Sequence, residues 1–265
     1  MHVWSSSNQK GGVGKTTTVV TLGGLAAQGG ERVLMVDLDP HGSLTAYFGH
    51  DPESLERSAY ELFREGVAGR EAVESLLLPT AVPGLTLLPA STALATLDRQ
   101  LGRREGMGLI VSRALAAVEG EFDVAIIDCP PMLGVLMVNA LAACQHLIVP
   151  VQTEFLAIKG LERMRHTLGM IEKARGLSVP YTIVPTMFDR RTRASVDSLR
   201  TLRTQFSERI WRSAIPVDTR FREASRRGLP LSHIDPAARG VEAYRMLLDD
   251  LVALEGAARR RKEAS

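Results

Sequence analysis

The segment Asn8–Thr18, which reads NQKGGVGKTTT, constrains the fold of this chain more than any other. It contains three glycines, Gly11, Gly12 and Gly14, which accept backbone conformations and close approaches that a Cβ atom forbids. Successive N–H groups can then turn inward and form a concave nest for an anion. A helix that starts directly after the glycines adds the positive end of its dipole. The segment therefore predicts a phosphate-binding loop between a strand and a helix.

Polar side chains beside the glycines complete the predicted phosphate site. Lys15 would place its ammonium on the β- and γ-phosphates, Thr16 would offer its hydroxyl to a Mg²⁺ ion, and Thr17 would bond the α-phosphate. The predicted nucleotide-binding residues of the loop are Gly11, Gly12, Val13, Gly14, Lys15, Thr16 and Thr17.

The start of the loop departs from the general phosphate-loop pattern. Gln9 stands where that pattern has glycine, and Lys10 adds a second lysine. The sequence KGGVGKTT resembles the deviant phosphate-loop signature of the ParA/MinD family of P-loop ATPases, which implies ATP and Mg²⁺ as cofactors. The resemblance also implies that Lys10 acts in catalysis by crossing a homodimer interface to the phosphates of the other subunit. The alternative is a glycine-rich turn with an ordinary surface lysine.

Two carboxylates follow the next predicted strand, Arg32–Asp37. This apolar run is typical of a parallel strand covered on both faces, and ligands bind at the carboxyl ends of such strands. Asp37 and Asp39 match the DxDP motif of the ParA/MinD family. The resemblance implies that Asp39 orients or activates the attacking water and that Asp37 is a partner on the Mg²⁺ side. The alternative is a solvated turn with the sequence DLDPHG.

His41 stands where DxDP motifs of partition ATPases lead us to expect glutamine. A histidine there could change its charge near neutral pH, or it could be a spacer that supports its neighbours. The surrounding sequence, DPHGSLTAYFGHDP, resembles the ParC-type branch of the family, which positions chemoreceptor arrays at cell poles.

The segment Phe122–Asp128, FDVAIID, predicts a further buried strand that ends in an aspartate. This is a Walker-B pattern, in which Asp128 accepts a hydrogen bond from a water on Mg²⁺ and, with Thr16, fixes the ion. Pro130 and Pro131 reproduce the DxPP ending of the family. The alternative is an aspartate that caps the following loop.

Later segments continue the resemblance and imply residues near the base and the dimer face. The strand predicted over Tyr181–Phe188 and the segment that reads IPVD lie by the adenine in relatives. The candidate base contacts are Met187, Phe188, Pro216 and Asp218. The segment PVQTE places Glu154 near the dimer face.

One region has a strong local charge. Residues 189–228 contain eleven arginines and five acidic residues, a net charge of +6. Such a face could hold DNA phosphates without sequence preference, and it could equally be a solvated, ion-paired surface. The whole chain carries only +2, so its overall charge gives no further argument for nucleic acid.

Length and composition predict the organisation of the chain. With 265 residues, 45% of them hydrophobic, and no visible linker, we expect one ATPase domain over residues 1–255 and a basic, disordered tail over 256–265. We expect no membrane insertion, because no signal or spanning segment is visible and Asp249 and Asp250 interrupt the apolar face of the final predicted helix, Val241–Leu254. The predicted location is the cytoplasm, at the cell pole or on the nucleoid.

The combined motifs predict an α/β fold, a doubly wound and mainly parallel sheet with helices on both faces. The predicted function is a Mg²⁺-ATP-dependent, dimerising ATPase switch, slow and stimulated by a partner protein. Its cargo would be a polar chemotaxis array, or chromosome or plasmid DNA. The alternative is a metabolic relative, either an amide ligase or a reductase component like the nitrogenase iron protein. The placement of Cys129 and Cys144 does not fit the cluster of the latter.

Overall fold

The computed structural model describes residues 1–66, 69–97, 107–176 and 178–263. The strands of this part of the chain form one seven-stranded sheet with the order β3-β4-β2-β5-β1-β6-β7. All neighbouring pairs are parallel except β3 and β4. The strands are β1 (His2–Ser6), β2 (Val33–Asp37), β3 (Leu78–Pro79), β4 (Leu85–Leu88), β5 (Val124–Asp128), β6 (His146–Gln152) and β7 (Tyr181–Thr186). The predicted doubly wound α/β fold is confirmed.

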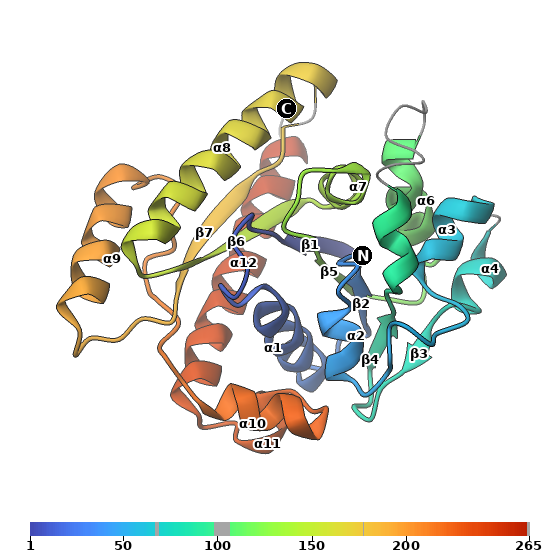
Figure 1. Cartoon of the computed structure of the whole chain (residues 1–265), viewed down its shortest axis with the longest axis horizontal. Coiled ribbons are helices and arrows are strands. Elements are labelled where there is room, and N and C mark those ends of the chain that lie inside the picture. Colours follow the sequence, from blue (N-terminus) through green and yellow to red (C-terminus); the bar gives the residue numbers. More distant parts are fainter. Residues whose placement is uncertain (67–68, 98–106, 177, 264–265) are drawn as a thin grey trace.

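Helices cover both faces of the sheet (Figure 1). α1 (Lys15–Gln28), α11 (Leu231–Ile234) and α12 (Arg239–Glu263) pack on one face. α3 (Ala59–Glu65), α6 (Ile110–Ala117), α7 (Val135–Ala143), α8 (Phe155–Arg175) and α9 (Arg193–Gln205) pack on the other. The remaining helices of the described residues are α2 (Ser43–Tyr47), α4 (Arg70–Glu74), α10 (Arg220–Arg227) and two short 3₁₀ helices, η1 (Thr92–Thr96) and η2 (Met107–Leu109).

The central strands are apolar along their whole length because both of their faces are covered. In β2, Val33 and Met35 join the core beneath α1 and α12, whereas Leu34 and Val36 join the core beneath α3 and α6. All five residues of β2 and all five of β5 are buried. A run of apolar residues without alternation is the expected pattern for such strands.

The parallel register brings polar residues from different segments to one edge of the sheet. β2 and β5 end side by side, with Asp37 paired to Asp128, and β1 ends beside them with Ser6 opposite Asp128. The loop that follows β1 and the turn that follows β2 therefore start at the same edge. This edge is the crevice where ligands bind in open α/β sheets.

The C-terminal helix is longer than predicted. α12 continues past Leu254 to Glu263, so the prediction of a disordered tail is wrong for residues 256–263, and residues 264–265 lie outside the described part. Alanine, arginine, lysine and glutamate dominate this stretch, and these residues have high helix propensity. Leu247 and Leu251 are buried in the core, whereas Leu254 is half exposed.

Within the described residues, no helix has both the length and the apolar composition that a bilayer crossing requires.

Candidate functional site

The loop between β1 and α1 is tied to neighbouring strands by its own polar groups. Asn8 donates from Nδ2 to the carbonyl of Pro150 in β6 at 2.7 Å. The carbonyl of Val13, a fully buried residue, accepts from Thr186 Oγ1 in β7 at 2.8 Å. Gly12 and Gly14 have φ values of +73° and +95°, which glycine adopts without strain. The loop is thus held in the shape that a nest of N–H groups needs.

Lys15 is the first residue of α1 and is buried, with 8% of its surface exposed. Within the described residues, its ammonium donates no hydrogen bond and forms no ion pair. Most of the side chain is buried, while its ammonium keeps some contact with solvent, so an anion that arrives at the loop can pair with it. The position therefore fits a phosphate group held at the loop.

Thr16 and Asp128 meet at the carboxyl edge of the sheet, as predicted. Thr16 donates from Oγ1 to Asp128 Oδ2 at 2.6 Å. The other oxygen, Oδ1 of Asp128, is buried and has no hydrogen-bond partner in the described part of the chain. An unsatisfied buried carboxylate oxygen beside a threonine hydroxyl fits a Mg²⁺ ion with its bound water, because Mg²⁺ prefers oxygen ligands and keeps several waters.

Asp37 lies beside Asp128, and both of its carboxylate oxygens accept hydrogen bonds. Its Oδ2 accepts from the backbone N–H of Thr45 at 2.8 Å and from Thr45 Oγ1 at 2.7 Å, and its Oδ1 accepts from the N–H of Asp39 at 3.1 Å. Thr45 was missed by the sequence analysis, although it lies in the segment that suggested the ParC-type branch. Asp128 therefore has the oxygen without any partner, whereas each oxygen of Asp37 already accepts at least one hydrogen bond.

Burial of these two neighbouring carboxyls disfavours their charged forms. Desolvation raises the pKa of Asp37 to about 7, and hydrogen bonds from Thr45 and Asp39 oppose this shift. The pKa of Asp128 is also raised well above its usual value, first by desolvation and then by the charge of Asp37, against the opposing effects of Thr16 and Lys15. A divalent cation at this edge would favour the charged carboxylates and would therefore counteract both shifts.

Asp39 occupies the turn after β2, with 11% of its side chain exposed. Its Oδ1 accepts from the backbone N–H of His41 at 3.1 Å and lies 2.9 Å from Nδ1 of the His41 ring. His41 itself is open to solvent, with 80% of its side chain exposed. The carboxylate is thus held by the turn that follows β2, at the carboxyl edge of the sheet, with a small part of its surface exposed.

Lys10 is paired within its own chain. Its ammonium forms an ion pair with Glu154, the residue directly before α8. Gln9 donates from Nε2 to Thr167 Oγ1 in α8 at 2.8 Å. Both residues at the start of the loop therefore contact α8 or its N-terminal end. Sequence reasoning assigned Lys10 and Glu154 to the same face but did not predict that they contact each other.

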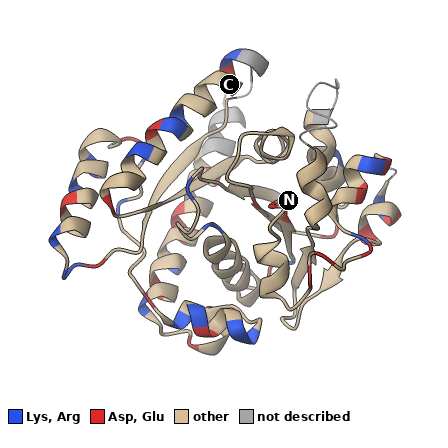
Figure 2. Ribbon diagram, in the orientation of Figure 1, with Lys and Arg blue, Asp and Glu red and all other residues tan. Residues whose placement is uncertain are grey.

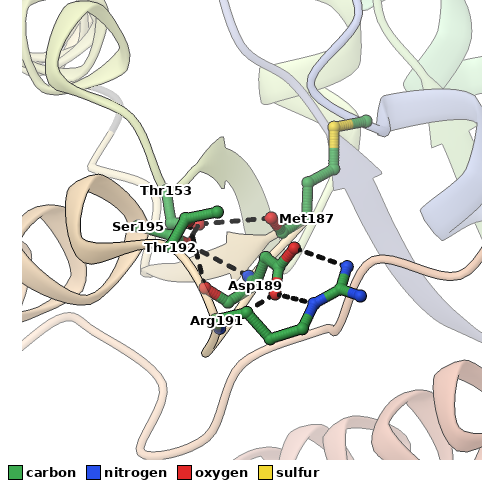
Figure 3. A network of polar contacts seen from close by, with 6 residues as sticks. All are labelled: Thr153, Met187, Asp189, Arg191, Thr192 and Ser195. Carbon is green, nitrogen blue, oxygen red and sulfur yellow. Dashed lines mark hydrogen bonds and ion pairs between the residues drawn. The ribbon is translucent and has the colours of Figure 1, made fainter.

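A strained loop follows β7 where the base contacts were predicted (Figure 3). Met187 has a φ of +52° and is the one non-glycine with positive φ among the described residues, a conformation that costs about 1–2 kcal/mol. Thr153 lies 2.6 Å from Ser195 Oγ and donates to the Met187 carbonyl at 3.3 Å, while Ser195 accepts from the N–H of Asp189. These contacts hold the loop in its strained form.

The other predicted base contacts lie next to this loop. Phe188 pairs with Pro216 through an isolated β-bridge, so these two residues are neighbours. The carboxylate of Asp218 accepts from Arg220 at 2.9 and 2.7 Å, and Arg220 lowers the pKa of this carboxyl. Because both carboxylate oxygens are engaged, a base contact at Asp218 would come from its backbone. All four assignments stay predictions.

The arginine-rich region covers α9, α10 and the segments before them (Figure 2). Six of its eleven arginines form ion pairs with acidic residues of the same chain: Arg191, Arg193, Arg200, Arg212, Arg220 and Arg226. Only two of the acidic partners, Asp235 and Asp250, lie outside residues 189–228, so local pairing lowers the net charge of this region only from +6 to +4 (6 − 2).

Cys129 lies in the core, and Cys144 is partly buried against it. Cys129 is fully buried, and desolvation raises the pKa of both thiols. Within the described residues, no group of three or more histidine, cysteine or acidic side chains could hold a metal ion. These thiols do not have the exposure or the thiolate character that an iron–sulfur cluster needs.

The fold and the loop define this chain as a P-loop nucleotide-binding protein. An AAA domain family model, AAA_31, matches residues 1–179. The sporulation initiation inhibitor protein Soj of Bacillus subtilis is 35% identical over 248 residues, which cover 93% of this chain and 96% of Soj. The chromosome partitioning protein ParA of Caulobacter vibrioides is 34% identical over 261 residues, or 96% of this chain and 95% of ParA. The chain therefore belongs to the ParA/MinD family of P-loop ATPases.

Solved structures agree with this fold. A cobyrinic acid a,c-diamide synthase from Mycobacterium smegmatis with bound ADP and magnesium superposes with a TM-score of 0.81 at 36% identity, over 95% of this chain and 94% of the other. Apo McdA of Cyanothece gives the same TM-score at 23% identity, over 94% of this chain and 99% of the other, and supports the fold alone.

The buried carboxyl pair generates a stability prediction. The folded-state pKa values are raised, so the folded protein binds protons more tightly than the unfolded chain, and stability falls as pH rises from about 4 to above 7. At pH 8 without nucleotide or Mg²⁺, Asp128→Asn should raise the free energy of unfolding by about 1 kcal/mol and Tm by about 2–4 °C.

At pH 5 the gain in the free energy of unfolding of Asp128→Asn should be smaller. In the presence of ATP, this variant should also lose the additional stabilisation that Mg²⁺ gives to the unsubstituted protein. Thermal unfolding at both pH values measures these effects. The exposed Asp249→Asn provides a control that should change little. An Asp128→Asn protein that is less stable at pH 8 would show that the carboxyl pair is not strained by burial.

Proposed function

We propose that this chain is a Mg²⁺-ATP-dependent ATPase switch of the ParA type, which dimerises with ATP and positions or segregates a large cellular cargo. The observation that carries the proposal is the largely buried Lys15, whose ammonium has no acceptor within the described residues, together with the unsatisfied Oδ1 of Asp128 at the same edge of the sheet. One group lacks an anion and the other lacks a cation. Mg²⁺-ATP supplies both. We take residues 1–255 as one ATPase domain.

The phosphate loop and the strand ends have separate roles in this proposal. The N–H groups of residues 11–17 and the Lys15 ammonium bind the phosphates, and Thr16 and Asp128 hold Mg²⁺, which neutralises charge on the γ-phosphate. Asp39 orients the attacking water. Met187, Phe188, Pro216 and the backbone of Asp218 contact the base.

Two substitutions separate nucleotide binding from hydrolysis. Lys15→Ala should abolish detectable ATP binding, because it removes the cation that faces the phosphates. Asp39→Ala should keep ATP affinity within about threefold and lower kcat about 100-fold, because only the orientation of the water is lost. Calorimetric titration and phosphate release measure the two effects. Rapid turnover by the Asp39→Ala protein would remove Asp39 from its assigned role.

The Lys10–Glu154 ion pair must open before the protein can dimerise in the proposed way. Lys10 is held by Glu154 within one subunit, so reaching the phosphates of the other subunit requires that this pair opens. The pair is partly exposed, with 30% and 38% of the side chains accessible, and such pairs contribute about 0.2–1 kcal/mol. The ion pair therefore opposes dimerisation only weakly, as a reversible switch requires.

Glu154→Gln should tighten the ATP-dependent dimer by about two- to fivefold, because the charge that retains Lys10 is removed. Sedimentation at a series of protein concentrations with a slowly hydrolysed ATP analogue measures this. Glu162→Gln is a matched control, since Glu162 pairs with Lys159 farther along α8 at 3.1 Å. A weaker dimer for Glu154→Gln would mean that Glu154 contributes contacts to the interface itself.

Two kinds of cargo follow from different observations. The DPHGSLTAYFGHDP segment favours a polar chemotaxis array, and the name of the Caulobacter relative favours chromosomal DNA. In both cases we place the protein in the cytoplasm, at the cell pole or on the nucleoid, with slow hydrolysis stimulated by a partner protein.

DNA binding discriminates between these cargoes. If the arginine-rich region holds DNA phosphates, ATP-loaded Asp39→Ala protein should bind non-specific duplex DNA. Its affinity should fall steeply when the salt concentration rises from about 50 to about 200 mM. Arg222→Ala with Arg227→Ala should weaken binding, because neither arginine is ion-paired in the described part of the chain. Arg64→Ala, on α3, is the control. Absence of binding at low salt would leave a protein-anchored array as the cargo.

The amide-ligase alternative draws support from the 36% identity with the protein named cobyrinic acid a,c-diamide synthase. A ligase needs a site for a carboxylic acid substrate, and we assign no residues to one. Incubation with Mg²⁺-ATP, an amine donor and cobyrinic acid should give ADP and phosphate without an amide product. The iron-protein alternative is disfavoured by the burial of Cys129.

A further inference from the structure

The side chain of His41 contacts Asp39 although it is otherwise in solvent. Its Nδ1 lies 2.9 Å from Asp39 Oδ1, while 80% of the His41 side chain is exposed. An exposed imidazole contributes little to the core, so this contact is not explained by packing. The Asp39 side chain, only 11% exposed, is the buried member of the pair.

The chemistry of the two groups sets the direction of this hydrogen bond. A carboxylate oxygen only accepts, so Nδ1 of His41 carries the hydrogen and donates it. The same Oδ1 also accepts from the backbone N–H of His41 at 3.1 Å. Oδ2 of Asp39 has no hydrogen bond within the described residues. One oxygen of the carboxylate is therefore fixed twice, and the other is left for a further donor such as water.

The turn that carries His41 is rigid. Gly42 donates its N–H to the carbonyl of Asp39 at 2.8 Å and has a φ of +60°. A Cβ atom at Gly42 would lie 2.2 Å from Cγ of Pro52, so the segment around Pro52 packs directly against the turn. The ring of Pro40 further restricts the backbone between the two side chains. The relation between His41 and Asp39 is thus set by the turn.

We infer that His41 is a positioning residue for hydrolysis: it donates from Nδ1 to Oδ1 of Asp39 and holds the carboxylate so that Oδ2 faces the attacking water. The inference rests on the proposed role of Asp39. A group that orients water acts only over a narrow range of positions, and a second group that fixes it is a recurring arrangement. The glutamine expected at this position carries an amide N–H that can donate in the same way.

Single-turnover hydrolysis of Mg²⁺-ATP by the full-length protein tests this role. His41→Ala should lower the hydrolysis rate about tenfold with ATP affinity within about twofold, because orientation is lost and phosphate binding is not. His41→Gln should restore most of the rate, and His41→Phe should not. Thermal stability should stay within about 1 °C for all three, since the side chain is exposed. His50→Ala, in the same segment, is the control.

The double variant Asp39→Ala with His41→Ala separates this inference from the proposed function. If His41 acts through Asp39, the double variant should hydrolyse ATP no more slowly than Asp39→Ala alone. A His41→Ala protein with the wild-type rate, or His41→Gln as slow as His41→Ala, overturns the positioning role while the role of Asp39 stands. Wild-type turnover by Asp39→Ala alone overturns the assignment of Asp39 and the inference with it.

Discussion

The burial of two carboxylates side by side is the constraint on which this site depends. Asp37 and Asp128 end neighbouring strands in register, and both pKa values are raised because water is excluded from them. Such a pair is unfavourable by itself and is balanced here by hydrogen bonds from Thr45 and Thr16, and by the nearby charge of Lys15. The two carboxyls therefore favour binding of a cation, and Lys15 favours binding of an anion beside it. α1 places Lys15 and Thr16 at the same edge of the sheet at which β2 and β5 place the two carboxyls.

The sequence predicted the parts of the fold that follow from short local patterns. Apolar runs ending in Asp37 and Asp128 predicted β2 and β5, since a parallel strand covered on both faces has no polar alternation. The glycine-rich sequence predicted both the shape of the loop and its place between β1 and α1, because the loop needs positive φ values at Gly12 and Gly14 and glycine adopts these without strain. Thr16 and Asp128 met as expected because parallel strands end at one edge.

Other features depend on tertiary contacts and could not be predicted from sequence patterns. The ion pair of Lys10 and Glu154 and the strained backbone of Met187 arise from segments far apart in the chain. The hydrogen bonds from Thr45 to Asp37 and from His41 to Asp39 are closer in sequence, but they need the turn after β2 to be known first. The end of α12 was missed because a basic composition predicts both a solvated helix and a disordered tail.

The central claim is that bound ATP, and not ADP, joins two copies of this chain. The most direct measurement is the molar mass in solution, by light scattering, of the hydrolysis-deficient Asp39→Ala protein with Mg²⁺ and each nucleotide. The account predicts twice the chain mass of 28.8 kDa with ATP and the single-chain mass with ADP. A mass of 28.8 kDa with ATP demonstrably bound would contradict it.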